Sequence, residues 1–157
     1  MKLNIGLSDQ GRKGVIDILN VLLADEYVLY TTTRNYHWNV VGPQFHDLHK
    51  FFESQYDELD EVVDEVAERV RALGGRALGS LTEFLKQTRL KEQPEKSVGG
   101  LGMVKNLLLS HEAIIQSLRA DLETCGDKFH DVGTNDFLTG LMERHEKMAW
   151  MLRAMVE

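Results

Sequence analysis

The stretch NYHWNVVGPQFHDLHKFFE, from Asn35 to Glu53, decides how the chain turns. Gly42 and Pro43 interrupt two long segments with helical periodicity, so we expect one helix to end here and a second to fold back. His37 then lies at the end of the first helix, and His49 lies in the first turns of the second. The stretch predicts a helical hairpin whose two histidines either converge on one point or are unrelated residues beside a loop.

The composition is that of a soluble globular protein. The chain has 157 residues, 43% of them apolar and 27% charged, which suggests a single domain over residues 1–157. The single cysteine, Cys125, fits a reducing compartment, and no apolar run approaches the roughly 20 residues of a membrane span. We therefore expect a cytoplasmic protein with no membrane segment. The net charge of −7 argues against a general polyanion binder and permits cation binding.

Helical periodicity covers most of the chain, and we find no convincing strand pattern. After a short arm over residues 1–12, the predicted helices run from about Lys13 to Trp38, from Gln44 to Leu73 and from Leu81 to Gln87. A further helix carries Leu101 to Leu122 and ends near Gly126, and a last one begins near Thr134. Four long helices with one long crossover predict an all-α, ferritin-like four-helix bundle, with a short extra helix in the crossover.

Local signals support two of these boundaries. Gly74 and Gly75 follow the second helix as a C-terminal cap, and Ser80 with Glu83 has the spacing of a capping box. The first helix has two apolar stripes instead of one, which indicates burial on two sides, as in a bundle that also packs against another chain. The stripes are Val15, Leu19, Leu22 and Leu29, and Ile16, Leu23, Tyr27 and Tyr30.

An acidic run marks the second helix. Eight carboxylates and no Lys or Arg fall between Phe51 and Glu68. Like charges this close on a helix are destabilising unless something compensates them, so the run is either a solvated face or a surface that meets cations. At about 100° per residue, His49, Glu53, Asp64 and Glu68 share one edge of the helix beside the core face, which predicts that they are half-buried.

Length shows that one chain cannot complete a metal site from this edge. His49 and Asp64 are separated by roughly 22 Å along the helix, whereas metal–ligand bonds are about 2.0 to 2.3 Å. His49 and Glu53 are one turn apart and can share an ion, and so can Asp64 and Glu68. Antiparallel pairing of two such helices would bring each pair opposite the other. Imidazole with carboxylate suits Fe(II), and also Zn(II), Mn(II) or Co(II), so the residue types alone do not select iron.

Taken together, these residues resemble the Dps family, the mini-ferritins. The resemblance is carried by NYHWN at residues 35–39, GPQFHDLHKFFE at 42–53, DEVAER at 64–69 and the closing WML at 150–152, and it covers essentially the whole chain. It implies a homododecameric shell with di-iron ferroxidase centres between subunits, in which His37 and His49 come from one chain and Asp64 and Glu68 from its neighbour. Glu53 stands where the family usually has aspartate, which keeps the charge and adds a methylene.

The resemblance also implies a function. A Dps-like protein is a ferroxidase that oxidises Fe(II), preferentially with hydrogen peroxide, stores the ferric oxide and protects against oxidative damage; zinc can substitute at its metal site. Trp38 matches a family tryptophan thought to pass electrons. Glu61 and Glu65 are candidates for the surface on which the mineral nucleates, and Asp127, Asp131 and Asp136 resemble the acidic pores that admit iron.

Two other functions compete with this one. Some Dps proteins condense DNA through a lysine-rich tail, but here Asp9 lies among Lys2, Arg12 and Lys13, so we expect no direct DNA binding. A metal-free helical scaffold would leave the acidic run beside a histidine unexplained. We expect His111 and His145 to be packing or surface residues. We expect His46 to be exposed or to support the site indirectly.

Overall fold

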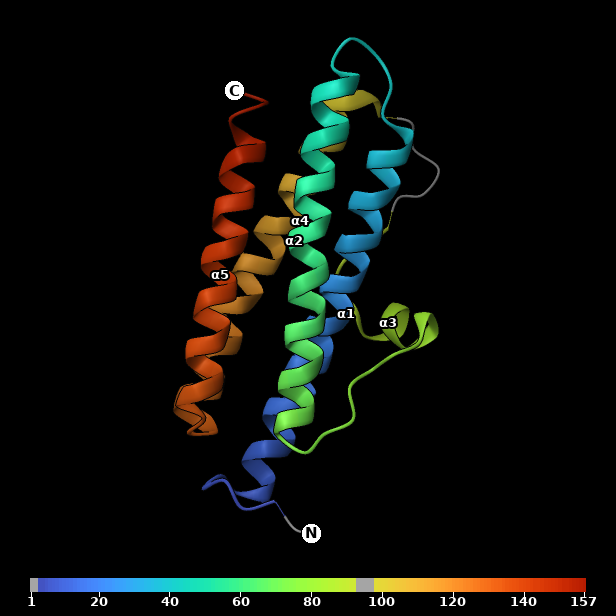
Figure 1. The fold of residues 1–157 in the computed structure, drawn as a ribbon. Helices are drawn as coiled ribbons and strands as arrows, with labels where there is room; N and C mark the ends of the chain where they lie inside the picture. The colour runs from blue at the N-terminus through green and yellow to red at the C-terminus, as the bar shows by residue number, and fades with distance from the viewer. Residues whose placement is uncertain (1–2, 93–97) are drawn as a thin grey trace.

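In the computed structural model, which describes residues 3–92 and 98–157, four long helices form a bundle of two antiparallel pairs (Figure 1). Helix α1 (Asp9–Asn39) leads into α2 (Phe45–Ala72), which runs back beside it. After the crossover, α4 (Gly99–Glu123) continues through a π-helical segment, η1 (Thr124–Lys128), and α5 (Val132–Arg153) returns to the opposite end. All the elements of the described residues are helical, which confirms the predicted all-α class, and the short helix lies in the crossover as predicted.

The crossover carries the short helix α3 (Leu81–Gln87), which lies against the side of the bundle (Figure 1). Its bounds are those predicted. The Ser80 hydroxyl accepts a hydrogen bond from the Glu83 backbone N–H at 3.3 Å and donates to the Glu83 carboxylate at 2.9 Å. The predicted N-cap at Ser80 is thereby confirmed, and the Glu83 carboxylate reaches back to accept a hydrogen bond from the Gly79 N–H at 3.3 Å.

Glycine makes both ends of α2 possible. Gly42 has a φ of 113°, a conformation that other residues rarely adopt, and so provides the turn between α1 and α2. At the other end the Gly74 N–H bonds to the Arg71 carbonyl and the Gly75 N–H bonds to the Val70 carbonyl. These two bonds form the Schellman arrangement that satisfies the last carbonyls of a helix, so the predicted cap is confirmed.

Two helices begin earlier than the sequence suggested, because side-chain caps lie upstream of the apolar pattern. Helix α1 begins at Asp9, where the Ser8 hydroxyl accepts a hydrogen bond from the Gly11 N–H at 3.0 Å. The end of the predicted arm is therefore helical; residues 1 and 2 of the arm lie outside the described residues. Helix α5 begins at Val132 instead of near Thr134, because the Asp131 carboxylate caps it.

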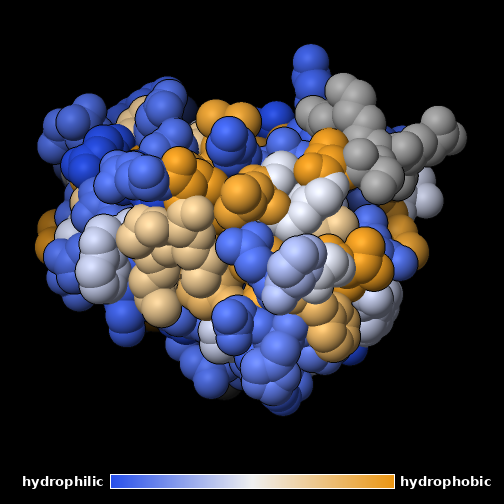
Figure 2. Space-filling model, turned by 90° about the horizontal axis from the view of Figure 1, so that it is seen from above, coloured by the Kyte–Doolittle hydropathy of each residue, from blue (hydrophilic) through white to orange (hydrophobic). Residues whose placement is uncertain are grey.

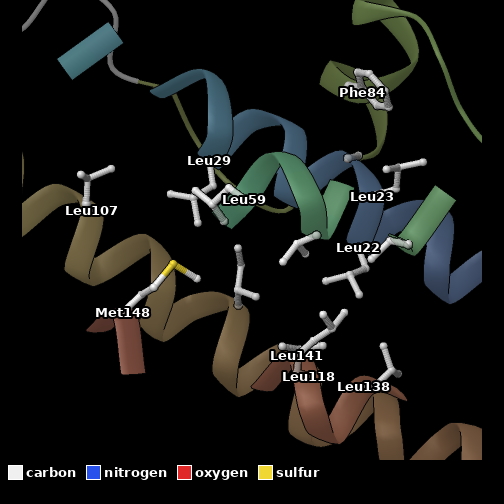
Figure 3. Close-up of a cluster of buried hydrophobic side chains, with 14 of the residues drawn as sticks. Leu22, Leu23, Leu29, Leu59, Phe84, Leu107, Leu118, Leu138, Leu141 and Met148 are labelled. Atoms are coloured by element: carbon white, nitrogen blue, oxygen red, sulfur yellow. The ribbon is translucent and has the colours of Figure 1, made fainter. Parts of the chain in front are cut away.

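The core fills the space between the four long helices (Figure 3). Leucines from all four of them meet there, and Phe84 of α3 closes one side. Helical periodicity at about 100° per residue predicts Tyr56 and Val63 on the core face of α2. This prediction was wrong by a small rotation, because Val62 is fully buried, whereas Val63 and Tyr56 are only partly buried. The buried face of α2 is thus turned away from its acidic edge, and Asp64 and Glu68 are exposed in the single chain instead of half-buried.

A buried carboxylate attaches the crossover to α1. The Asp25 carboxylate, 1% exposed, accepts hydrogen bonds from the Thr88 hydroxyl, the Arg89 N–H and the Arg89 guanidinium at 2.6 to 2.8 Å. A buried charge needs such partners, because desolvation without them is costly. No helix of the described part of the chain is long and apolar enough to cross a membrane.

Candidate metal centre

The turn at Gly42 brings His37 and His49 into direct contact. The Nδ1 atom of each ring lies 2.8 Å from the backbone carbonyl oxygen of the other residue. A carbonyl only accepts a hydrogen bond, so each Nδ1 carries the proton and each Nε2 keeps its lone pair. Holding one ring nitrogen by a carbonyl while the other faces a metal is the usual arrangement of a histidine ligand. Both imidazoles are therefore prepared to bind a cation through Nε2.

The two rings are also stacked on each other. Their centroids are 3.8 Å apart and their planes differ by 21°. Phe45 stacks on His49 from a distance of 5.1 Å, and Tyr56 meets His37 almost at a right angle at 5.2 Å. The imidazole lone pairs lie in the ring planes, and nearly parallel planes cannot direct both of them at an ion between the rings. The stacked imidazoles therefore suit two neighbouring ions, one bound by each ring, better than a single ion bound by both rings.

Glu53 lies close to both imidazoles on the next turn of α2. Its carboxylate accepts a hydrogen bond from the Lys50 ammonium at 2.7 Å. This contact is the main reason that the pKa of Glu53 is lowered; burial opposes the shift, and the Lys50 charge and the nearby imidazoles of His37 and His49 add to it. Glu53 is therefore ionised near neutral pH and within electrostatic reach of the histidines. Lys50 is a competitor that a bound cation would have to displace.

Asp64 and Glu68 lie well away from these residues on the same straight helix, as the length argument required. Both side chains are exposed. Within residues 3–92 and 98–157, no three His, Cys, Asp or Glu side chains converge closely enough to hold a metal ion. The single chain thus places the His37–His49 pair near Glu53 at one end of α2 and the exposed Asp64 and Glu68 further along the helix.

The acidic run is less isolated than the sequence suggested, because Arg144 of α5 lies against it. Its guanidinium forms ion pairs with Glu58 at 3.3 Å, Glu61 at 3.6 Å and Glu65 at 2.8 Å. One cation 79 to 86 residues away in sequence thereby offsets part of the repulsion within α2. Among the described residues, Arg144 forms no ion pair with Asp64 or Glu68, and both of these side chains stay exposed.

The residues predicted to line a pore have different environments. Asp131 is 4% exposed and its carboxylate is fully engaged: it accepts hydrogen bonds from the Thr134 N–H at 2.9 Å, the Thr134 hydroxyl at 2.6 Å and Arg69 at 3.2 Å. It caps α5 and anchors α2. Asp127 and Asp136 are exposed on either side of this cap. Trp38 is 63% exposed beside His37, and the Arg34 guanidinium lies 5.3 Å from its ring centroid.

A buried polar chain in the bundle was not foreseen. The Glu26 carboxylate lies 2.9 Å from Nε2 of His145, and Nδ1 of His145 lies 2.9 Å from Nδ1 of His111. All three side chains are fully buried, and they come from α1, α5 and α4. Burial, and to a lesser extent His145, lowers the pKa of His111 well below its usual range. His111 and His145 are thus packing residues, one of the two expected alternatives, and the hydrogen bond between them is what the sequence did not show.

Comparisons with known proteins agree with this architecture. The sequence matches the ferritin-like domain over residues 16–157. It is 51% identical over 156 residues to an uncharacterized low temperature-induced protein of Nostoc sp., covering 99% of this chain and 87% of the relative. It is 38% identical over 142 residues to DNA protection during starvation protein 2 of Bacillus anthracis, covering 90% and 96%.

A solved structure gives the same result. The Dps protein from Vibrio cholerae O1, described as a member of a broad superfamily of ferritin-like diiron-carboxylate proteins, superimposes with a TM-score of 0.92 at 33% identity, covering 100% of this chain and 98% of that one. The helical bundle and its crossover are thus those of the ferritin-like class. Within this class, the chain belongs to the Dps family.

Proposed function

We propose that this protein oxidises Fe(II) and stores the ferric product, and thereby protects its cell from oxidative damage. The observation that carries the proposal is the pair of reciprocal His37–His49 hydrogen bonds, which leaves both Nε2 atoms free beside the ionised Glu53. Family membership supports iron handling in general terms. The intersubunit location, the ferroxidase activity and the preference for peroxide are part of the proposal.

In the proposed site, His37, His49 and Glu53 of one chain face Asp64 and Glu68 of a second. Nitrogen and carboxylate donors suit Fe(II), and the carboxylates stabilise the ferric product. Two Fe(II) ions each lose one electron, and both electrons reduce one hydrogen peroxide, with two protons, to two waters. Pairing the electrons avoids release of hydroxyl radical. The stacked rings, each directing its own lone pair, support a site for two substrate ions.

We further propose that the native particle is a closed homododecamer. Apolar side chains are exposed around the half-site: Trp38 is 63%, Val41 77% and Phe45 46% exposed. The end of the bundle that carries the turn also shows hydrophobic surface between hydrophilic residues (Figure 2). Such groups support contacts with further copies of the chain. In a shell, exposed Asp127 and Asp136 are candidates to admit iron, and Glu61 and Glu65 to nucleate the mineral.

Anaerobic titration with Fe(II), followed by hydrogen peroxide, tests the proposed function. We expect saturable binding of up to two Fe(II) per chain and rapid oxidation when peroxide is added. In a His37→Ala/His49→Ala variant, binding at this site and fast oxidation should both be lost, because the imidazole donors are gone. Zinc should compete for the same site. A parent protein that binds no Fe(II) would refute the proposal, and light scattering of a monomer would refute the shell.

We expect this protein not to bind DNA, although several relatives are named for DNA protection. At physiological salt and pH 7.5, the protein should not retard duplex DNA in a gel, because a net charge of −7 per chain repels phosphate and Asp9 pairs with Arg12 at 2.7 Å. A mobility shift that weakens with added salt would instead indicate a basic surface. The same assay with a variant carrying added N-terminal lysines is a positive control.

A further inference from the structure

A guanidinium and a set of aromatic rings lie behind His37, and the proposed chemistry leaves them without a role. Tyr56 meets the His37 ring with an interplanar angle of 81° and a centroid distance of 5.2 Å. The Arg34 guanidinium carbon lies 4.8 Å from the centroid of Tyr56. Arg34 is in turn fixed by a hydrogen bond of 2.6 Å from its Nη1 to the Tyr30 hydroxyl. The order of contacts is therefore Tyr30, Arg34, Tyr56 and His37.

We propose that Tyr56 and Arg34 are positioning residues for the His37 ligand, an inference that rests on the proposed function of the site. The hydrogen bond from Nδ1 to the His49 carbonyl fixes the His37 tautomer, yet the ring can still pivot about this bond. Contacts from two directions oppose this pivot: His49 stacks on the ring, and Tyr56 meets it at nearly a right angle. The Nε2 lone pair of His37 thus keeps one direction before a cation arrives.

Arg34 acts on His37 through Tyr56. Its guanidinium lies over the Tyr56 ring, a cation–π contact that restricts where this ring can move. A direct effect of its charge on the site would have the opposite sign, because a positive group near a cation site weakens binding and its removal would strengthen binding. Positioning through Tyr56 predicts that removal of Arg34 weakens cation binding. The sign of the change therefore separates the two roles.

Cobalt(II) is a suitable probe, because nitrogen and carboxylate donors bind it and its visible absorption bands report ligand geometry. We expect Tyr56→Leu to weaken Co(II) binding at the histidine site about tenfold and to alter these bands, as loss of a residue that orients a ligand does in other metal sites. Tyr56→Phe keeps the ring and should bind nearly as the parent does. Arg34→Met should also weaken binding, and it should add little in the Tyr56→Leu background, because residues that act through one contact are not additive.

The matched control is Phe129→Leu, which removes an aromatic ring that packs over Gly14, near the opposite end of α1 from His37. It should leave the Co(II) affinity and spectrum unchanged, and light scattering should show the same assembly for every variant compared. Parent-like binding by Tyr56→Leu, or stronger binding by Arg34→Met, would overturn the inference and leave the proposed function intact. Absence of Co(II) binding by the parent at this site would overturn both.

Discussion

Shells co-assembled from two inactive variants should recover about a quarter of the parent ferroxidase activity if, as proposed, each site is shared across a twofold interface. The first variant is His37→Ala/His49→Ala and the second is Asp64→Ala/Glu68→Ala. Each alone damages every site. In a mixed pair, one site combines both damaged halves, and the other combines the intact histidines of the second variant with the intact carboxylates of the first. Random mixing makes about half of the pairs mixed and restores half of their sites.

The measurement is initial Fe(II) oxidation by peroxide after the two variants are dissociated, mixed and reassembled. Native mass spectrometry confirms that the shells contain both chains. Simple mixing without dissociation is the control, and it should remain inactive because no interface forms between variants. If one chain supplied all the ligands, mixing could restore no site. Inactive shells of confirmed mixed composition would therefore contradict a site shared between subunits.

The parts of the fold that sequence predicted correctly depend on neighbours along the chain. Helix α3 was predicted to the residue because the Ser80 to Glu83 spacing is a local signal. The turn at Gly42 and the cap at Gly74 also come from glycines whose φ values are positive. The contact between His37 and His49 followed from this turn, because only twelve residues separate them. The sequence could not show that each Nδ1 donates to the carbonyl of the other residue.

The features that the sequence missed join residues far apart in the chain. Arg144 neutralises carboxylates on α2 about 80 positions earlier, and Asp25 accepts hydrogen bonds from a crossover 63 and 64 positions later. In the sequence Asp131 is one of several acidic residues near a loop, and only the structure shows that its carboxylate is bound by Arg69 and Thr134. The rotation of α2 that buries Val62 depends on how four helices share one core. Helical periodicity gives the width of a buried face but not its exact centre.

The largest stability effect should come from breaking the buried chain of Glu26, His145 and His111. We expect Glu26→Ala to lower the free energy of unfolding by about 3 to 5 kcal/mol, because it leaves the His145 imidazole buried without its carboxylate partner. A triple variant, Glu26→Leu with His111→Leu and His145→Leu, should recover most of this loss, since replacing a whole buried polar group by apolar side chains is often neutral or stabilising. Guanidinium unfolding at one fixed protein concentration gives the comparison, because stability of an assembly depends on concentration.

The parent protein and the triple variant should also differ in how their stability responds to acid. Burial lowers the pKa of His111, so this imidazole stays neutral in the folded chain, whereas the unfolded chain takes up a proton at this residue below about pH 6.5. The unfolded state then binds more protons, and the free energy of unfolding falls by up to about 1.4 kcal/mol for each pH unit below this value. The triple variant lacks this contribution, so its stability should fall less steeply between pH 6.5 and 5 than that of the parent. If stability fell equally steeply with pH in both proteins over this window, His111 would be protonated in the folded bundle. In the unfolding experiment, a triple variant as unstable as Glu26→Ala would show that leucines cannot replace the packing of the three polar side chains.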